Sequence, residues 1–302
     1  MNNMQHCGFI AIVGRPNVGK STLLNKILGE KISITSSKPQ TTRHRILGIK
    51  TIDSDQIIFV DTPGLHRGPK HMINRLMLRA ANNAILDVDG VVFLIDARNW
   101  REEDEDILKK IIASQKPFMI ALNKVDRIFD KEKLMNFLKM LNEKLNILGL
   151  QGVPLIPISA KSGRNIENLE AAVLHLLPEG EHYYPDDQIT DRNRRFMAAE
   201  LIREKLMRYL GSEVPHELTV EIEQFKEEEK LLRISAVILV ERQGQKKIVI
   251  GEGGAVLKKI GRLARLDMEA SFEEKVFLEL WVKLKGGWTD DARALASLGY
   301  DE

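Results

Sequence analysis

Hydrophobic and polar positions in the first half of the chain form two alternating kinds of segment. Short, continuous apolar runs at residues 9–13, 90–95 and 117–122 predict strands that are buried on both faces. Stretches with apolar residues at helical spacing follow them, for example at residues 102–113 and 131–148. Because strands and helices alternate, we expect a doubly wound, mostly parallel α/β sheet.

The other segments of this half fit the same scheme. Further strands are expected at residues 46–52, 56–60 and 153–158, and a short extended piece at 31–34. Further helices are expected at residues 22–28 and 165–177, and after a polar stretch that begins at residue 66. Ligands of such open sheets bind at the carboxyl ends of the strands, so the motifs at those ends carry the functional information.

The pattern changes beyond residue 178. Residues 178–187 contain two prolines and a glycine without any hydrophobic period, which indicates a linker. From residue 191 we expect a helix, three strands, a helix opened by a G-x-x-G turn, a second helix and a last strand. The strands are expected at residues 218–223, 231–240, 246–250 and 276–282. The sequence therefore predicts a domain at 1–178, a linker at 179–190 and a smaller α+β domain at 191–302.

Composition narrows the class of protein without selecting a function. The chain has 302 residues, with 45 Lys and Arg against 43 Asp and Glu, so its formal charge of +2 does not indicate a nucleic-acid binder. The single cysteine, Cys7, cannot form an internal disulfide, which fits the reducing cytoplasm. No apolar run approaches the roughly 20 residues of a membrane-spanning helix. We therefore expect a cytoplasmic protein without a transmembrane segment.

The first chemical signal lies between the strand at 9–13 and the helix at 22–28. The motif G-x-x-x-x-G-K-S is a P-loop, in which backbone N–H groups and a helix N-terminus surround a phosphate. Lys20 is expected to reach the β- and γ-phosphates, and the Ser21 hydroxyl to ligate Mg²⁺. The predicted nucleotide-binding residues here are Gly14, Arg15, Pro16, Asn17, Val18, Gly19, Lys20, Ser21 and Thr22.

Two further motifs are typical of a nucleotide switch. The polar loop at residues 36–45 should supply a threonine whose hydroxyl ligates Mg²⁺, and Thr42 is the first choice and Thr41 the second. Asp61, at the end of a buried strand, can hold Mg²⁺ through water, and the Gly64 N–H can bond the γ-phosphate and sense its loss. The predicted catalytic residues are Lys20, Thr42 and Gly64, and the predicted metal ligands are Ser21, Thr42 and Asp61. Thr62 and Pro63, together with Asp61 and Gly64, are predicted to bind the nucleotide.

The residue after Gly64 affects the mechanism. Many GTPases have a glutamine there that orients the attacking water, whereas this chain has Leu65, whose side chain cannot form a hydrogen bond. The water must then be positioned by the backbone, by a bound ion or by a partner. We expect slow intrinsic hydrolysis.

The base is read by the N-K-V-D motif that follows the strand at 117–122. The Asp126 carboxylate can accept hydrogen bonds from N1–H and the exocyclic amine of guanine, a pair of donors that adenine lacks. Asn123 is expected to reach N7 and to brace the loop, and the stem of Lys124 to cover the ring. In the later turn Ser159-Ala160-Lys161, the Ala160 N–H should point at guanine O6. These motifs predict a site for GTP and GDP.

In the second half, a G-x-x-G turn opens a helix, where bare backbone can lie against a nucleic-acid backbone. Overall charge does not favour this role, because residues 191–302 contain 20 Lys and Arg against 21 Asp and Glu. A solvated helix face would explain the nearby cations equally well, and Glu252 should weaken phosphate attraction. The candidate RNA-binding residues are Gly251, Glu252, Gly253, Gly254, Lys246, Lys247, Lys258, Lys259, Arg262 and Arg265.

The motifs G-R-P-N-V-G-K-S, Q-T-T-R-H, D-T-P-G-L, N-K-V-D and S-A-K stand in the order of translation-factor-class GTPases, and the chain resembles the Era family over essentially its whole length. The elements after residue 191 are similar to a type-2 KH domain, which that family carries there. The resemblance implies binding of small-subunit ribosomal RNA (16S) near its 3′ end and a role in maturation of the small ribosomal subunit. It also places Asn17 where related GTPases hold a monovalent cation, so potassium assisting hydrolysis is a hypothesis.

Other interpretations stay open at this point. The chain could be an RNA-binding assembly scaffold in which the nucleotide is structural, or a membrane-associated signalling GTPase whose second domain binds protein. Peripheral association with the inner membrane is left open for the same reason. We expect a monomer with GTP or GDP and Mg²⁺ as cofactors, and the small ribosomal subunit with its RNA as partner.

Overall fold

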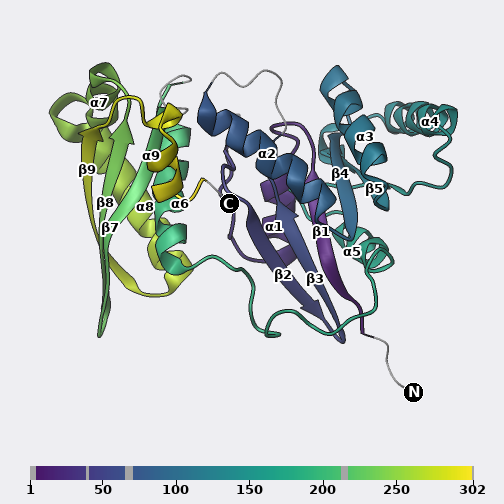
Figure 1. Ribbon diagram of the computed structural model, residues 1–302, viewed down its shortest axis with the longest axis horizontal. Coiled ribbons are helices and arrows are strands. Elements are labelled where there is room, and N and C mark those ends of the chain that lie inside the picture. The colour runs from purple at the N-terminus through teal and green to yellow at the C-terminus, as the bar shows by residue number, and fades with distance from the viewer. Residues whose placement is uncertain (1–4, 39–40, 65–70, 212–216, 301–302) are drawn as a thin grey trace. The chain divides into compact units, whose positions relative to one another are not determined.

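The computed structural model describes residues 5–38, 41–64, 71–211 and 217–300. Contacts divide the chain into two compact units, of which the first comprises residues 1–33, 42–69 and 77–191 and the second residues 34–41, 70–76 and 192–302. The first contains a six-stranded sheet and the second a three-stranded sheet (Figure 1). None of the described helices is long and apolar enough to span a bilayer.

The six-stranded sheet has the order β2-β3-β1-β4-β5-β6. Only β2 and β3 are antiparallel, and all other neighbouring strands are parallel. The continuous apolar runs lie at its centre, because a strand covered on both faces needs apolar side chains on both. The expected doubly wound α/β sheet is confirmed. Its strands are β1 (Cys7–Val13), β2 (Ile46–Ile52), β3 (Asp55–Asp61), β4 (Gly90–Asp96), β5 (Phe118–Asn123) and β6 (Leu155–Pro157).

Helices cover both faces of this sheet. One apolar core joins it to α2 (Met72–Leu86), α3 (Glu102–Ser114) and α4 (Lys131–Ile147). On the other face, Gly48 of β2 makes room for α1 (Lys20–Leu28), since a Cβ at this position would lie 2.6 Å from Leu24 Cδ1. The helix α5 (Ile166–Leu174) follows β6.

The segment expected to be a linker is fastened to the first unit. Pro178 O accepts a hydrogen bond from Cys7 N at 3.1 Å, and Ile189 O accepts one from Ile49 N at 2.8 Å. The Asp191 carboxylate accepts a further one from Leu47 N at 3.1 Å. Residues 178–191 are therefore hydrogen-bonded to β1 at their start and to β2 at their end, and backbone N–H groups of the sheet donate these three bonds.

The second unit packs helices on one face of the sheet β7-β8-β9, in which β7 is antiparallel and β9 parallel to β8. Alternate residues of β8, such as Ile234 and Ile238, share a core with Ile202 and Ile260 of the helices. In β7, Val220 and Ile222 are buried whereas Glu221 and Glu223 are exposed, so this strand is buried on one face only. The elements are α6 (Arg194–Tyr209), β7 (Leu218–Glu228), β8 (Leu231–Val240), α7 (Gln243–Ile250), η3 (Glu252–Gly254), α8 (Ala255–Phe272), β9 (Lys275–Leu284), η4 (Trp288–Asp290) and α9 (Ala292–Ser297).

The prediction of a strand at residues 246–250 is wrong, because these residues belong to the helix α7. Their β-branched composition is typical of a strand, but Gln245 and Val249 are the buried residues of α7, and a spacing of four fits one face of a helix. The Gln245 side chain also accepts a hydrogen bond from Arg242 N at 2.9 Å and so satisfies an N–H group at the helix start.

The prediction of two helices after the G-x-x-G turn is also wrong, because a single helix, α8, continues without a break to the loop before β9. Gly261 lies inside α8 and does not end it. A Cβ at this position would lie 3.3 Å from Leu280 Cδ1, so glycine allows α8 to approach β9 closely. Sequence alone does not distinguish such a packing glycine from a helix end.

The short extended piece expected at residues 31–34 is not a strand. The side chain of Asn25 holds it in place of a neighbouring strand: its Oδ1 accepts hydrogen bonds from Ile32 N and Ser33 N, and its Nδ2 donates to Ser33 O. The α1 helix thereby fixes the backbone that carries Ser33.

Candidate functional site

The P-loop connects the end of β1 to the start of α1. Asn17 and Gly19 have positive φ values of 63° and 110°. A backbone of this kind favours glycine, which is the residue at position 19. A Cβ at Gly14 would lie 2.3 Å from Leu94 O, and one at Gly19 would lie 2.4 Å from Asn123 Nδ2. The two glycines are therefore required by close neighbours as well as by backbone shape.

Lys20 is buried at the first residue of α1. Its Nζ donates to Gly14 O at 3.0 Å and to Arg15 O at 3.3 Å, so the loop closes around the ammonium group. Burial lowers the pKa of Lys20 to about 8, and the nearby charge of Asp61 acts in the opposite direction. An anionic phosphate at the loop would compensate a buried cation of this kind.

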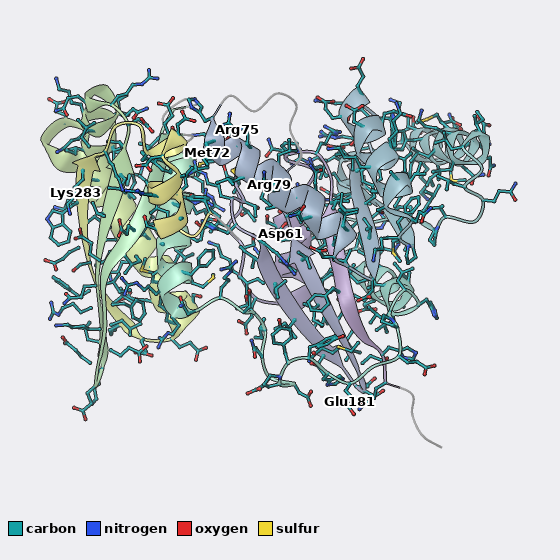
Figure 2. The ribbon with its side chains drawn as sticks, viewed as in Figure 1. Asp61, Met72, Arg75, Arg79, Glu181 and Lys283 are labelled. Atoms are coloured by element: carbon teal, nitrogen blue, oxygen red, sulfur yellow. The ribbon has the colours of Figure 1, made fainter. Side chains whose placement is uncertain are left out.

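Three oxygen-bearing side chains converge beside the P-loop. Ser21 Oγ lies 2.8 Å from Thr42 Oγ1 and donates to Asp61 Oδ2 at 2.8 Å, and Thr42 Oγ1 lies 3.5 Å from the same carboxylate oxygen. Asp61 ends β3 (Figure 2) and is fully buried. Its Oδ1 has no hydrogen-bond partner among the described residues.

This donor set fits a hard divalent cation. Hydroxyl and carboxylate oxygens are the ligands of Mg²⁺, and a buried carboxylate oxygen without a partner is costly unless a cation meets it. Thr42 and not Thr41 faces the cluster, because Thr41 Oγ1 donates to Lys38 O at 2.7 Å. Ser33 is a member that sequence reasoning missed, and its Oγ donates to Asp61 Oδ2 at 2.9 Å.

The segment after Asp61 returns to the P-loop. The Thr62 hydroxyl donates to Ile12 O at 3.2 Å, and a Cβ at Gly64 would lie 3.0 Å from Pro16 Cγ. Glycine at this position therefore lets the backbone approach the phosphate-binding loop. Leu65 lies outside the described residues.

The predicted base site is assembled around Asn123. Its Nδ2 donates to Val18 O at 2.8 Å, and its Oδ1 accepts from Lys124 N at 2.8 Å and from Ala160 N at 2.9 Å. The Ala160 N–H, which was expected to point at guanine O6, is thus engaged with Asn123. Ser159 Oγ donates to Asp126 Oδ1 at 2.6 Å, which orients the carboxylate.

Sequence reasoning missed Asp96, the last residue of β4. Lys124 Nζ donates to Asn17 O at 2.6 Å and to Asp96 Oδ2 at 3.0 Å, while Arg98 makes a bidentate contact with the same carboxylate at 2.8 and 2.7 Å. Burial raises the pKa of Asp96, but hydrogen bonds from Arg98 and Lys124 outweigh this effect and hold the pKa well below its usual range. The signal that identified Asp61, a carboxylate at the end of a buried strand, was present here too.

Arg15 lies in the P-loop, but its side chain points away from the phosphate position. Its Nε donates to both carboxylate oxygens of Asp104 at 3.1 and 3.0 Å, and its Nη2 donates to Asn99 Oδ1 at 2.8 Å. The expected contribution of Arg15 to nucleotide binding is thus limited to its backbone, and its side chain ties the loop to α3. Of the other predicted residues, Val18 is buried, Pro16 and Thr22 are half-buried, and Asn17 and Lys161 are exposed.

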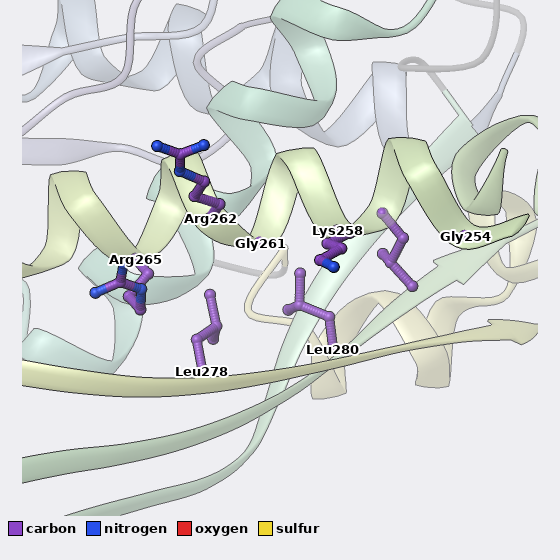
Figure 3. A pocket seen from close by; sticks show the side chains of 8 residues that line it. Gly254, Lys258, Gly261, Arg262, Arg265, Leu278 and Leu280 are labelled. Atoms are coloured by element: carbon purple, nitrogen blue, oxygen red, sulfur yellow. The ribbon is translucent and has the colours of Figure 1, made fainter.

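In the second unit, a cavity of about 420 Å³ lies between α8 and β9. Gly254 lies at one end of it, Leu278 and Leu280 form an apolar floor, and Figure 3 shows the cationic side chains along α8. Gly251, Gly253 and Gly254 all have positive φ values, so the turn depends on glycine. The predicted cations that line this cavity are Lys258, Arg262 and Arg265.

The other predicted cations do not line it. Lys246 and Lys247 lie on α7, and Lys259 Nζ stands 4.6 Å from the centre of the Tyr209 ring. Glu252 is exposed within the turn itself. The structure thus brings three of the six predicted cations together with the G-x-x-G turn.

Comparison with known proteins identifies both units. The family model described as 50S ribosome-binding GTPase matches residues 9–124, and the KH domain model matches residues 213–289. The chain is 55% identical over 300 residues to GTPase Era of Pseudomonas fluorescens (strain Pf0-1), covering 99% of this chain and 98% of the relative. This chain belongs to the Era GTPase family. The predicted P-loop GTPase domain and C-terminal KH domain are therefore confirmed, and the chain is a GTP hydrolase.

Other members of the Era family agree with this assignment. The Era protein of Pseudomonas aeruginosa (strain LESB58) is 55% identical over 98% of this chain and 95% of its own length. A crystal structure of an Aquifex aeolicus Era variant bound to GDP·AlF4⁻ superposes with a TM-score of 0.93 at 38% identity, covering 98% of this chain and 100% of that one. A structure of Era in complex with MgGDPNP and nucleotides 1506–1542 of 16S ribosomal RNA has a TM-score of 0.93 at 39% identity, covering 99% and 100%.

Proposed function

We propose that this GTPase uses Mg²⁺ held by Ser21, Thr42 and Asp61. The observation that carries this assignment is the convergence of the two hydroxyl groups on the buried Asp61 carboxylate, 2.8 and 3.5 Å away. Relatives crystallised with GDP·AlF4⁻ and with MgGDPNP support it. Bound there, Mg²⁺ would neutralise negative charge on the transferring phosphoryl group.

The chain's own residues supply the remaining interactions. Lys20 stabilises the β- and γ-phosphates, and the Gly64 N–H contacts the γ-phosphate. Asp126 selects guanine by accepting hydrogen bonds from guanine N1–H and the exocyclic amine. Asn123 positions the base site by holding Val18 O and Ala160 N. Asn17 binds potassium, which replaces the missing glutamine in promoting hydrolysis; equal turnover in potassium and sodium would count against this role.

We propose that the cavity between α8 and β9, called the groove along α8 below, binds single-stranded RNA from the 3′ region of the small-subunit ribosomal RNA. The glycine turn allows close approach of a nucleic-acid backbone, Lys258, Arg262 and Arg265 meet phosphates, and the leucine floor contacts bases. The relative solved with nucleotides 1506–1542 of 16S ribosomal RNA supports this choice of partner. The function is then maturation of the small ribosomal subunit, carried out by a cytoplasmic monomer with domains at 1–178 and 191–302.

The deciding experiment is GTP turnover with and without purified small-subunit ribosomal RNA in potassium buffer. We expect slow basal turnover that the RNA stimulates. An Asp126→Asn variant is the control, because it loses the acceptor for guanine and should lose GTP turnover while still binding RNA. RNA binding without any change in turnover would favour the scaffold interpretation, in which the nucleotide is structural.

A further inference from the structure

A second cavity, of about 600 Å³, lies in the first unit and belongs to neither of the sites above. It is formed by the residues after β4, by the 3-10 helix η1 (Val125–Arg127) and by the first half of α4. Its lining does not include Asn123, Asp126 or the turn at 159–161, so it is distinct from the predicted base site. Six lining residues matter for its chemistry: Arg98, Arg127, Phe129, Lys133, Phe137 and Met140.

The wall of this cavity is mostly apolar and open to solvent. The Phe129 side chain is 96% exposed, and Met140 is exposed as well, whereas Phe137 packs partly against the core. The next residue, Asp130, caps α4 by accepting from Glu132 N at 2.9 Å. An aromatic ring held in water beside an open apolar cavity is typical of a docking surface.

Cations surround the apolar wall. Arg127 and Lys133 have neither an ion pair nor a side-chain hydrogen bond within the part of the chain that the structure describes, and Arg98 is shared with Asp96. The one carboxylate in the lining, Asp130, is engaged as the helix cap. The cavity therefore combines apolar surface with an excess of positive charge.

We propose that this cavity docks an acidic peptide segment of a partner protein through one large apolar side chain. The apolar side chain would enter between Phe129, Phe137 and Met140, and carboxylates flanking it would pair with Arg127 and Lys133. A concave site favours an inserted side chain over a flat membrane surface. The few cations and the predominance of apolar lining favour a peptide over a nucleic acid, whose binding depends on many phosphate contacts.

The test measures binding of short fluorescent peptides to the full-length, GDP-loaded protein by anisotropy. The first probe is a glutamate-rich peptide with one central phenylalanine. In the second probe serine replaces the phenylalanine, and in the third lysines replace the glutamates. We expect saturable binding of the first probe only, with a dissociation constant of about 1 mM or lower.

Variants of the protein locate the site. Phe129→Ser and Arg127→Glu should each weaken binding of the first probe about tenfold, since truncating an anchor residue commonly costs that much. Ile147→Ser is the matched control, because Ile147 is an exposed apolar residue of α4 outside the cavity and should leave binding unchanged. GTP turnover should be the same in all three variants, which separates this proposal from the function of the nucleotide site.

Several results would overturn the proposal. These are the absence of saturable binding up to about 1 mM, equal binding of all three probes, and equal binding by wild type and Phe129→Ser. Binding of anionic lipid vesicles that depends on Phe129, without peptide binding, would assign the surface to a membrane instead. Self-association that is lost in Phe129→Ser would assign it to a second copy of the chain.

Discussion

Asp96 shows how much of the nucleotide site depends on a single residue that contacts no nucleotide in our assignment. It receives hydrogen bonds from Lys124 and Arg98, and Lys124 in turn holds Asn17 O of the P-loop. The carboxylate therefore fixes a cation that links the base-reading motif to the phosphate-binding loop. Its effect on nucleotide binding is indirect, through the position of Lys124.

Replacing Asp96 tests this role. Asp96→Asn removes the negative charge that holds Lys124, so we expect GDP to dissociate about tenfold faster, the equivalent of roughly 1.4 kcal/mol. The measurement is the release rate of a fluorescent GDP analogue. Glu105→Gln is the matched control, because it breaks a carboxylate pair with Lys144 at 2.6 Å elsewhere in the same unit. Identical release from the wild type and Asp96→Asn would contradict the assignment.

Lys20 provides a test based on pH. Its pKa is about 8 in the folded chain against an ordinary 10.5, so between these values the unfolded chain binds more protons. The free energy of unfolding of the nucleotide-free protein should therefore rise across this window. From pH 7 to pH 10, wild type should gain about 2 kcal/mol relative to Lys20→Met. Urea unfolding at both pH values measures this gain, and a constant difference between the two proteins would refute the prediction.

At the scale of elements, residues 178–191 behave as part of the sheet and not as a spacer. His182 contributes to this attachment: its Nδ1 lies 2.8 Å from Asp186 Oδ1, and its Nε2 lies 3.0 Å from Ser54 O in the β2–β3 turn. Its ring joins the segment to the hairpin, a contact between residues 128 positions apart.

This contact predicts a pH dependence of stability. The hydrogen bond to Asp186 raises the pKa of His182, although its burial acts in the opposite direction. Its contribution is fully present below the unfolded pKa near 6.5 and is lost as pH rises through the folded value. Wild type should therefore lose stability relative to His182→Gln when the pH is raised from about 5.5 to about 8.5. Thermal unfolding gives the comparison, and His175→Gln, at an exposed histidine, should leave the pH dependence unchanged.

At the scale of the whole molecule, charge is nearly balanced, so RNA binding must depend on local cations. Three cations line the groove along α8, while Glu252 lies in its glycine turn. For single-stranded RNA, three phosphate contacts correspond to a slope of about −2 in log K against log salt. Glu252→Lys should strengthen binding and make this slope more negative by about 0.7.

Equilibrium binding of a single-stranded ribosomal RNA fragment at several salt concentrations measures both quantities. Glu229→Lys makes the same charge change at an exposed position after β7, outside the groove, and serves as the control. A wild-type slope much steeper than about −2 would mean that general charge and not the groove determines RNA binding. The same conclusion would follow if Glu229→Lys strengthened binding as much as Glu252→Lys.

Local sequence was sufficient to predict the positions of the strands in the first domain, the P-loop, the Asp61 and N-K-V-D motifs, and the G-x-x-G turn. These features are local: a buried strand requires a continuous apolar run, and a phosphate loop requires glycines at fixed spacing. The sequence ranked Thr42 before Thr41, and in the folded chain the Thr42 hydroxyl group faces Asp61 whereas the Thr41 hydroxyl group donates to Lys38 O.

The residues that support the site could be identified only in the folded chain. Asp96, Ser33 and the Arg15–Asp104 pair act across sequence separations of 28, 28 and 89 residues, which no local pattern records. The same reason explains the error at α7, where burial against partners distant in sequence selected a helix although composition indicated a strand.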